Sequence, residues 1–300
     1  MKKSMLKKVR AYLAHRRSLG FRLRSEGRVL LEFARYADGL AHHGALTRQL
    51  AIRWACLPKS ADRLYWARRL EIVRTFAQHL LLIEPHTQVP PRHLFGPAHR
   101  RRAPHLYTPA ELRHLLRRAG RITGKLRPHT YQTLIGLLAC TGLRISEALR
   151  LKLHDVDWQQ SLLIIRESKG QTRLVPLHPT ASRPMQAYAQ RRQKLFPGAE
   201  YFFVSDSGGP LPYGRVQPMF IRLRAGISFI KRPPRLHDLR HTMASTVLQR
   251  WLASRRGALN RVLVLARYLG HRNLEATYWY LTARPQLLAE AAQRFNPHSS

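Results

Sequence analysis

Apolar residues recur every three or four positions through most of the chain, which is the spacing of an amphipathic helix. In residues 1–83 the pattern holds over 5–13, 29–40 and 60–83, with Lys and Arg on the intervening positions. The turn-forming residues Gly20, Gly44 and Pro58 separate these stretches. The pattern predicts a small bundle of about four helices in residues 1–83.

The pattern breaks between residues 84 and 107, where proline is too dense for regular structure. The prolines of this segment are Pro85, Pro90, Pro91, Pro97 and Pro104. Three consecutive arginines, 100–102, lie among them. The segment predicts an extended linker that follows DNA phosphates or, equally, a solubilising loop.

A second domain, 108–300, opens with Thr108-Pro109-Ala110-Glu111, a capping box with proline at the first helical position. The β-rich runs 161–167 and 172–177 flank a turn at Lys169-Gly170-Gln171 and predict a hairpin. Residues 201–204 predict one more strand. Helices are expected at 109–118, 128–139, 144–151, 180–194, 213–224, 238–252, 258–269 and 273–282. The predicted fold is mainly α with a small β-sheet (α+β), consisting of a helical N-terminal domain and a mixed second domain.

Charge narrows the choice of partner. The chain has 300 residues with 53 Lys+Arg against 16 Asp+Glu, a formal net charge of +37. Residues 1–100 carry 20 − 6 = +14 and residues 101–300 carry 33 − 10 = +23, so the charge is not a local tail. A field this positive favours a polyanion such as DNA or RNA. Given this charge, we favour an N-terminal bundle that contacts DNA over one whose charge is merely solvated.

The number of cysteines and the length of the apolar stretches exclude further classes of protein. Two cysteines, Cys56 and Cys140, exclude a disulfide framework. The basic N-terminus has no apolar run after it, and no apolar stretch is long enough to span a bilayer. We expect a cytoplasmic protein with no membrane partner.

Familiar catalytic motifs are missing. The sequence has no Gly-rich loop ending in Gly-Lys-Ser/Thr and no HExxH, and its carboxylates are sparse and scattered. An enzyme of this composition that acts on phosphodiesters must stabilise transition-state charge with Arg, Lys and His.

Residues 108–300 supply such groups in four places. Arg144 follows a glycine turn, with Glu147 three residues on and on the same helix face. Lys169 stands at the hairpin turn, and His237 and Arg240 share a helix face. Leu269-Gly270-His271 is followed nine residues later by Tyr280.

Each of these features alone has a simpler interpretation. Arg144 on its own is typical of a surface arginine, Lys169 of an ordinary turn and Tyr280 of a packed aromatic. His237 and His241 at i, i+4 could hold zinc, but no clear third ligand accompanies them, so no metal is predicted.

Together and in this order, the four features resemble the tyrosine recombinase (phage integrase) family. The resemblance covers nearly the whole chain in architecture: a core-binding domain, 1–83, a linker, 84–107, and a catalytic domain, 108–300, with a C-terminal tail helix. The specific motifs lie between residues 141 and 280.

The resemblance implies a role for each residue. Tyr280 would attack the scissile phosphate and form a 3′-phosphotyrosine. Arg144 and Arg240 would clamp the phosphate oxygens, and Lys169 would protonate the leaving 5′-oxygen. His237 and His271 would bind the phosphate or assist proton transfer, and Glu147 would orient the site. No cofactor, ATP or obligatory metal is implied.

Three parts of the C-terminal region stay open. Tyr278 lies about 200° from Tyr280 on a helix, so it is interpreted as structural. The stretch 242–268, with Arg255-Arg256-Gly257, is longer than is usual in the family and could contact DNA or a neighbouring subunit. Residues 285–295 predict a tail helix that docks on its own domain or on a neighbouring protomer.

The resemblance also implies double-stranded DNA as partner and a homo-oligomer, a synaptic tetramer, possibly alongside related recombinases. The stretch Tyr12–Phe21 is similar to integrases of bacterial mobile elements, which favours integration or excision. Alternatives are a type IB topoisomerase, a non-catalytic DNA-binding protein on the same scaffold, and a basic RNA-binding protein.

Overall fold

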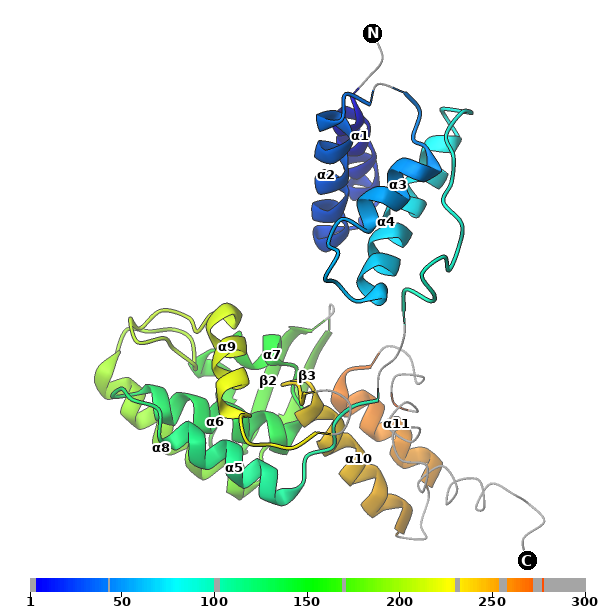
Figure 1. Ribbon diagram of the computed structural model, residues 1–300. Helices are drawn as coiled ribbons and strands as arrows, with labels where there is room; N and C mark the ends of the chain where they lie inside the picture. The colour runs from blue at the N-terminus through cyan, green and yellow to red at the C-terminus, as the bar shows by residue number, and fades with distance from the viewer. Residues whose placement is uncertain are drawn as a thin grey trace, which may run out of the picture. The chain divides into compact units, whose positions relative to one another are not determined.

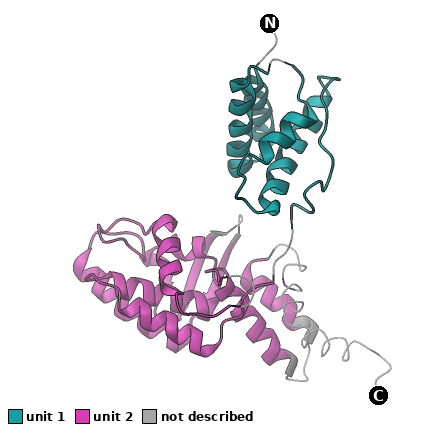
Figure 2. Cartoon of the chain, in the orientation of Figure 1, with its two compact units in different colours: residues 1–102 teal, residues 103–300 magenta. Residues whose placement is uncertain are grey.

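The computed structural model describes all residues except 1–3, 43, 100–102, 169–170, 230–232, 254–257, 272–276 and 278–300. It divides into two compact units, residues 1–102 and 103–300 (Figure 2). Each unit has its own hydrophobic core and is described by itself.

The first unit contains the four helices that the sequence predicts (Figure 1). Side chains of Ser4, Thr47 and Asp62 accept backbone N–H groups at the starts of α1, α3 and α4 and so fix where these helices begin. The helices are α1 (Met5–Ser18), α2 (Arg24–Gly39), α3 (Arg48–Ala55) and α4 (Arg63–Leu81).

Aromatic rings join these helices. The rings of Phe33 and Trp54 pack edge to face with centroids 5.3 Å apart, and both side chains are buried. Arg69 lies over the Trp54 ring at 3.7 Å and donates to the Trp54 carbonyl oxygen at 3.1 Å. This cation–π contact explains how an arginine is accommodated in the core of the unit.

Residues 84–99 of the proline-rich segment belong to the first unit and form no helix or strand, whereas residues 103–107 belong to the second unit. The backbone N–H of Gln88 donates to the Leu46 carbonyl at 2.8 Å. Arg74 and Arg68 donate from Nε to the carbonyls of Pro90 and Ala98, at 3.1 and 3.2 Å. Helix side chains therefore supply the hydrogen bonds that prolines cannot make among themselves.

The second unit is mainly helical with a small sheet (Figure 1). The predicted capping box is confirmed: Glu111 N–H donates to Thr108 Oγ1 at 3.2 Å, and Thr108 N–H donates to Glu111 Oε2 at 2.7 Å. The helices are α5 (Pro109–Gly120), α6 (Arg127–Thr141), α7 (Ile145–Leu149), α8 (Pro179–Leu195), α9 (Tyr213–Leu223), α10 (Asp238–Ala253) and α11 (Ala258–Leu269), with one 3₁₀ turn, Leu153–Asp155.

The sheet is antiparallel in the order β1 (Val156–Asp157), β2 (Leu162–Ser168), β3 (Gln171–Pro176). Leu163 pairs with Val175, and both are buried, whereas Leu174 is exposed. This alternation confirms the predicted hairpin. The two-residue strand β1 was not predicted, since two residues are too short to carry a periodic signal.

The prediction of a strand at residues 201–204 is wrong. Tyr201 and Val204 form only single bridges, to Lys152 and Pro210 respectively. Phe202 and Phe203 are both fully buried in the core of the second unit. The β-rich composition here reflects aromatic burial on both sides of the chain rather than membership of the sheet.

Helix α6 determines where the candidate site lies. It is buried on several faces and packs against α5, α8 and α10. It ends at Gly142, whose φ of +63° is left-handed. A Cβ there would lie 3.2 Å from Met243 Sδ and 3.3 Å from Leu269 Cδ2, so α6 ends directly against α10 and α11. No helix in the described ranges is long and apolar enough to cross a membrane.

Candidate active site

Arg144 lies at the turn after Gly142 and caps the short helix α7. Its backbone N–H donates to Glu147 Oε2 at 2.9 Å, and its guanidinium donates to Glu147 Oε1 at 2.7 Å. A second guanidinium nitrogen donates to the carbonyl of Gly270 at 3.1 Å. Arg144 and Glu147 were predicted to share a helix face, and the structure shows in addition that they form an ion pair.

Glu147 is a buried carboxylate between two arginines. Its side chain is 1% exposed. Besides Arg144, it accepts both terminal nitrogens of Arg173, at 2.7 and 3.2 Å. Two guanidinium groups share one carboxylate, so the cluster keeps a positive charge while the buried anion is fully paired.

Sequence reasoning missed Arg173, on β3. The signal was present in the strand alternation: Arg173 has the same parity as the buried Val175, so it lies on the buried face of the sheet. An arginine on the buried face of a strand requires a buried partner. The sequence did not reveal that this partner is Glu147, 26 positions away.

Arg240 is almost fully buried, at 2% exposure. It donates to the Gly142 carbonyl at 2.7 Å and to the Leu269 carbonyl at 2.7 Å. Arg144 and Arg240 thus bind consecutive carbonyls, those of Gly270 and Leu269, at the C-terminal end of α11. The negative end of the helix dipole helps to hold two like charges there.

His271 links this cluster to the segment that follows. Its Nε2 lies 2.9 Å from an Arg240 nitrogen, and its Nδ1 lies 2.7 Å from Thr277 Oγ1. Because a guanidinium can only donate, Nε2 accepts and the ring proton lies on Nδ1, which donates to the hydroxyl. Thr277 is fully buried and precedes Tyr280 by three residues.

His237, which precedes α10, lies in the field of both arginines. Part of the residue is exposed, but surrounding protein atoms desolvate the ring, and this is the main reason that its pKa is lowered to about 4. The positive charge of Arg240 is the next cause, and that of Arg144 also contributes. The rings of His241 and His237 pack edge to face with centroids 5.0 Å apart. Desolvation is the larger cause, and the nearby His237 the next, of the lowering of the His241 pKa to about 4. Both imidazoles are uncharged at neutral pH.

Five of the seven predicted site residues come together here: Arg144, Glu147, His237, Arg240 and His271. Lys169 and Tyr280 lie outside the described residues, as do Tyr278, Arg255-Arg256-Gly257 and the predicted tail helix at 285–295. Within the described ranges, no group of three or more His, Cys, Asp or Glu could hold a metal ion.

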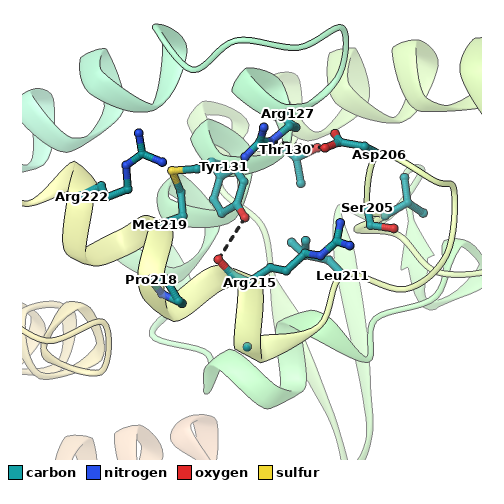
Figure 3. A pocket seen from close by; sticks show the side chains of 12 residues that line it. Arg127, Thr130, Tyr131, Ser205, Asp206, Leu211, Arg215, Pro218, Met219 and Arg222 are labelled. Atoms are coloured by element: carbon teal, nitrogen blue, oxygen red, sulfur yellow. Dashed lines mark hydrogen bonds and ion pairs between the residues drawn. The ribbon is translucent and has the colours of Figure 1, made fainter.

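A separate cavity of about 420 Å³ lies between α6, α9 and the loop before α9 (Figure 3). Arg127, Arg215 and Arg222 border it, with Asp206 beside Arg127 at 3.4 Å. It lies at the N-terminal end of α6, and the arginine cluster lies at the C-terminal end, about 20 Å away at 1.5 Å per residue. None of the predicted site residues lines this cavity, so concavity alone does not locate the candidate site.

Comparison with known protein families adds a further finding. The sequence model of the phage integrase family matches residues 107–286. An integrase/recombinase of Sinorhizobium fredii, named y4rB, is 38% identical over 95% of both chains. The tyrosine recombinase XerD of Rhizobium meliloti is 30% identical over 77% of this chain and 74% of its own.

Two solved structures share the fold. The Tn1549 transposon integrase, in complex with transposon right-end DNA, matches with a TM-score of 0.71 and 16% identity over 97% of this chain and 99% of its own. A lambda integrase tetramer bound to a Holliday junction matches with a TM-score of 0.64 and 17% identity over 91% of this chain and 76% of its own. At these identities the likeness concerns the fold alone.

Proposed function

The chain belongs to the phage integrase family of DNA strand-transferring enzymes, and we propose that it is a site-specific tyrosine recombinase that cuts and rejoins double-stranded DNA through Tyr280. One observation carries the proposal: Arg144 and Arg240 are anchored on consecutive carbonyls of a single turn. Two permanently charged forks held this close suit the non-bridging oxygens of one phosphodiester.

The proposed reaction is a transesterification. The Tyr280 hydroxyl gives up its proton to a neutral histidine or to water, and its oxygen forms a bond to phosphorus while the bond from phosphorus to the 5′-oxygen breaks, leaving a 3′-phosphotyrosine and a 5′-hydroxyl. The extra negative charge on the pentavalent phosphorus is stabilised by Arg144 and Arg240. Lys169 gives the departing oxygen its proton. A 5′-hydroxyl from another strand reverses the step and completes the exchange.

The histidines have distinct parts in this scheme. With its pKa near 4 in the absence of DNA, His237 is neutral, so it can accept a proton or donate a hydrogen bond to the phosphate. His271 faces Arg240 with its Nε2 lone pair and so orients that guanidinium. Glu147 sets the direction of Arg144 and takes no proton.

Mobile-element integration or excision is the proposed context. The names of the relatives support it: integrase/recombinase for the Sinorhizobium fredii protein and transposon integrase for the structural neighbour. A multimer on DNA is proposed by analogy with the lambda integrase tetramer on its Holliday junction.

Covalent trapping tests the nucleophile. Nicked suicide duplexes from DNA flanking the gene are incubated with the full chain, and protein–DNA adducts are resolved on denaturing gels. Tyr280→Phe abolishes the adduct, whereas Tyr278→Phe, the matched control two residues away, retains it. An undiminished adduct with Tyr280→Phe contradicts the assignment.

A second assay separates recombination from its alternatives. Two labelled duplexes are mixed with the enzyme, and recombinant joints are scored beside relaxation of a supercoiled plasmid. Recombinant joints support the proposal. Relaxation without joints indicates a type IB topoisomerase, and binding without an adduct indicates a non-catalytic scaffold.

A further inference from the structure

Arg173 has no part in the proposed reaction, yet its guanidinium contacts the arginine cluster at several points. Its side chain is 12% exposed and forms a two-pronged ion pair with buried Glu147. A buried carboxylate is stable only when its oxygens are paired and hydrogen-bonded. Arg144 supplies one side of that pairing, and Arg173 supplies the other.

The same guanidinium also supports the turn on which both clamp arginines are anchored. Arg173 Nε donates to the Tyr268 carbonyl at 2.9 Å. A Cβ on Gly270, where φ is +67°, would approach Arg173 Nη1 to 3.1 Å, so the guanidinium packs closely against this glycine. The next carbonyls along the chain, Leu269 and Gly270, accept Arg240 and Arg144.

Arg173 therefore contacts both supports of the clamp: the carboxylate that directs Arg144, and the turn that fixes Arg144 and Arg240. It does so from β3, the strand that begins two residues after Lys169 in the sequence. Its nearest neighbours at the site are protein groups: a carboxylate, a carbonyl and a glycine.

We propose that Arg173 is a positioning residue of this active site, which holds Glu147 and the turn 268–270 in register so that Arg144 and Arg240 meet one phosphate. The proposal rests on the recombinase function above. It adds a residue that acts through Glu147 and through the turn rather than on DNA.

The chemistry requires arginine at this position. The planar guanidinium offers five N–H groups in a fixed fork and can serve the carboxylate and the carbonyl at once. Arg173→Lys would keep the positive charge but concentrate it on one ammonium group, which could not pair with Glu147 and bond to the Tyr268 carbonyl at the same time. Glutamine at 173 would remove the charge as well.

The test measures DNA affinity and cleavage rate separately. For wild type, R173Q and R173K, DNA Kd is obtained by titration with the suicide duplex, and the adduct rate is measured in single turnover at saturating duplex. We expect R173Q to slow adduct formation about 100-fold, the scale of an approximately 1 Å misplacement. Kd should stay within about threefold, a change below 1 kcal/mol. The adduct rate of R173K should lie between those of wild type and R173Q.

Arg166 provides a matched control. It lies on β2 of the same hairpin and pairs at 2.6 Å with Asp155, a carboxylate that is 4% exposed. R166Q removes an ion pair to a buried carboxylate without touching Glu147 or the turn. Its adduct rate should remain close to wild type. An R166Q loss equal to that of R173Q would mean that any ion pair of the hairpin matters, and would overturn the proposal.

A double-mutant cycle tests the route through Glu147. If Arg173 acts through this carboxylate, R173Q should cost much less in an E147Q background than in wild type. Fully additive losses would overturn the proposal, as would a wild-type adduct rate in R173Q or a loss confined to Kd. Should R173Q fail to fold by circular dichroism, R173K decides: an unchanged R173K rate overturns the proposal. Absence of any wild-type adduct would instead contradict the recombinase function itself.

Discussion

At the residue scale, backbone carbonyls place the cationic groups of the site as much as carboxylates do. Arg240 binds the carbonyls of Gly142 and Leu269, and Arg144 binds that of Gly270. Carbonyl partners leave the guanidinium charge in place, whereas each carboxylate would cancel one charge. The buried carboxylate that pairs with Arg144, Glu147, is shared with a second arginine, so the cluster stays cationic and suited to a phosphodiester.

Thr277 gives a prediction at this scale. Thr277→Val removes the oxygen that accepts the His271 Nδ1 proton, so the half-buried imidazole loses this hydrogen bond. We expect a loss of about 0.5–1.5 kcal/mol in the free energy of unfolding, measured in urea. Adduct formation should slow, because the proton of His271 is no longer held on Nδ1, away from Arg240. Thr277→Ser, which keeps the hydroxyl, should restore both.

Thr130→Val is the control for a buried threonine. Its hydroxyl bonds to Leu126 O within the first turn of α6, at the far end of that helix from the cluster. The variant should leave the adduct rate unchanged. Equal adduct rates in Thr277→Val and wild type would show that Thr277 does not orient His271.

The two packed histidines predict a pH dependence of stability. Their ordinary pKa of 6.5 is lowered to about 4 in the folded protein, so between these values the unfolded chain binds more protons than the folded one. Stability should therefore fall as pH drops from about 6.5 to about 4. Urea unfolding of wild type and of the His237→Gln/His241→Gln double variant across this pH range measures how much of the pH dependence of stability comes from these two histidines. A slope as steep in the double variant as in wild type would contradict the assignment.

At the scale of elements, the ends of helices bring distant residues into one site. Helix α6 ends at Gly142, α11 ends at Gly270, and both glycines adopt positive φ. These turns deliver Arg144 and His271 to the same place that Arg240 reaches from α10. The site is therefore sensitive to the two glycines, although neither is expected to touch DNA.

Gly142→Ala tests this role. The left-handed conformation costs a non-glycine residue about 1–2 kcal/mol, and the new Cβ would also crowd Met243 and Leu269. Unfolding in urea should show at least that loss, and adduct formation should slow because Arg144 is displaced. Gly198→Ala, where an added Cβ would meet nothing within 4 Å and φ is not positive, should change neither quantity. Wild-type values in Gly142→Ala would contradict the account.

Local signals made most elements predictable. The capping box at Thr108 and the glycine at 142 marked helix ends correctly, and the alternation of the hairpin gave β2 and β3. Local signals failed where the cause was not local: residues 201–204 are apolar because they fill the core, not because they extend the sheet. Arg173 and Thr277 were missed for the same reason, since their partners were not visible from sequence.

At the scale of the whole molecule, charge governs the expected interaction with DNA. A net charge of +37 is spread over both units, so binding should release many counterions. A protein that makes roughly 6–10 phosphate contacts loses about 10³–10⁵ in affinity between about 50 and about 200 mM salt. Titration of duplex DNA across this range should show a steep linear fall of log affinity with log salt.

RNA of the same length is the competitor that tests partner choice. It should compete weakly at raised salt, because the proposed site requires a duplex DNA phosphate held between Arg144 and Arg240. A flat salt dependence, or equal competition by RNA, would contradict DNA as the partner.

The most direct test of the central claim is to identify the residue bonded to DNA. Adduct formed on the suicide duplex is digested with protease and nuclease, and the remaining nucleotide-bearing peptide is sequenced by tandem mass spectrometry. The account predicts a phosphodiester bond on the Tyr280 oxygen, to the 3′-end of the cleaved strand. A nucleotide on any other residue, Tyr278 included, or at a 5′-end, would contradict it.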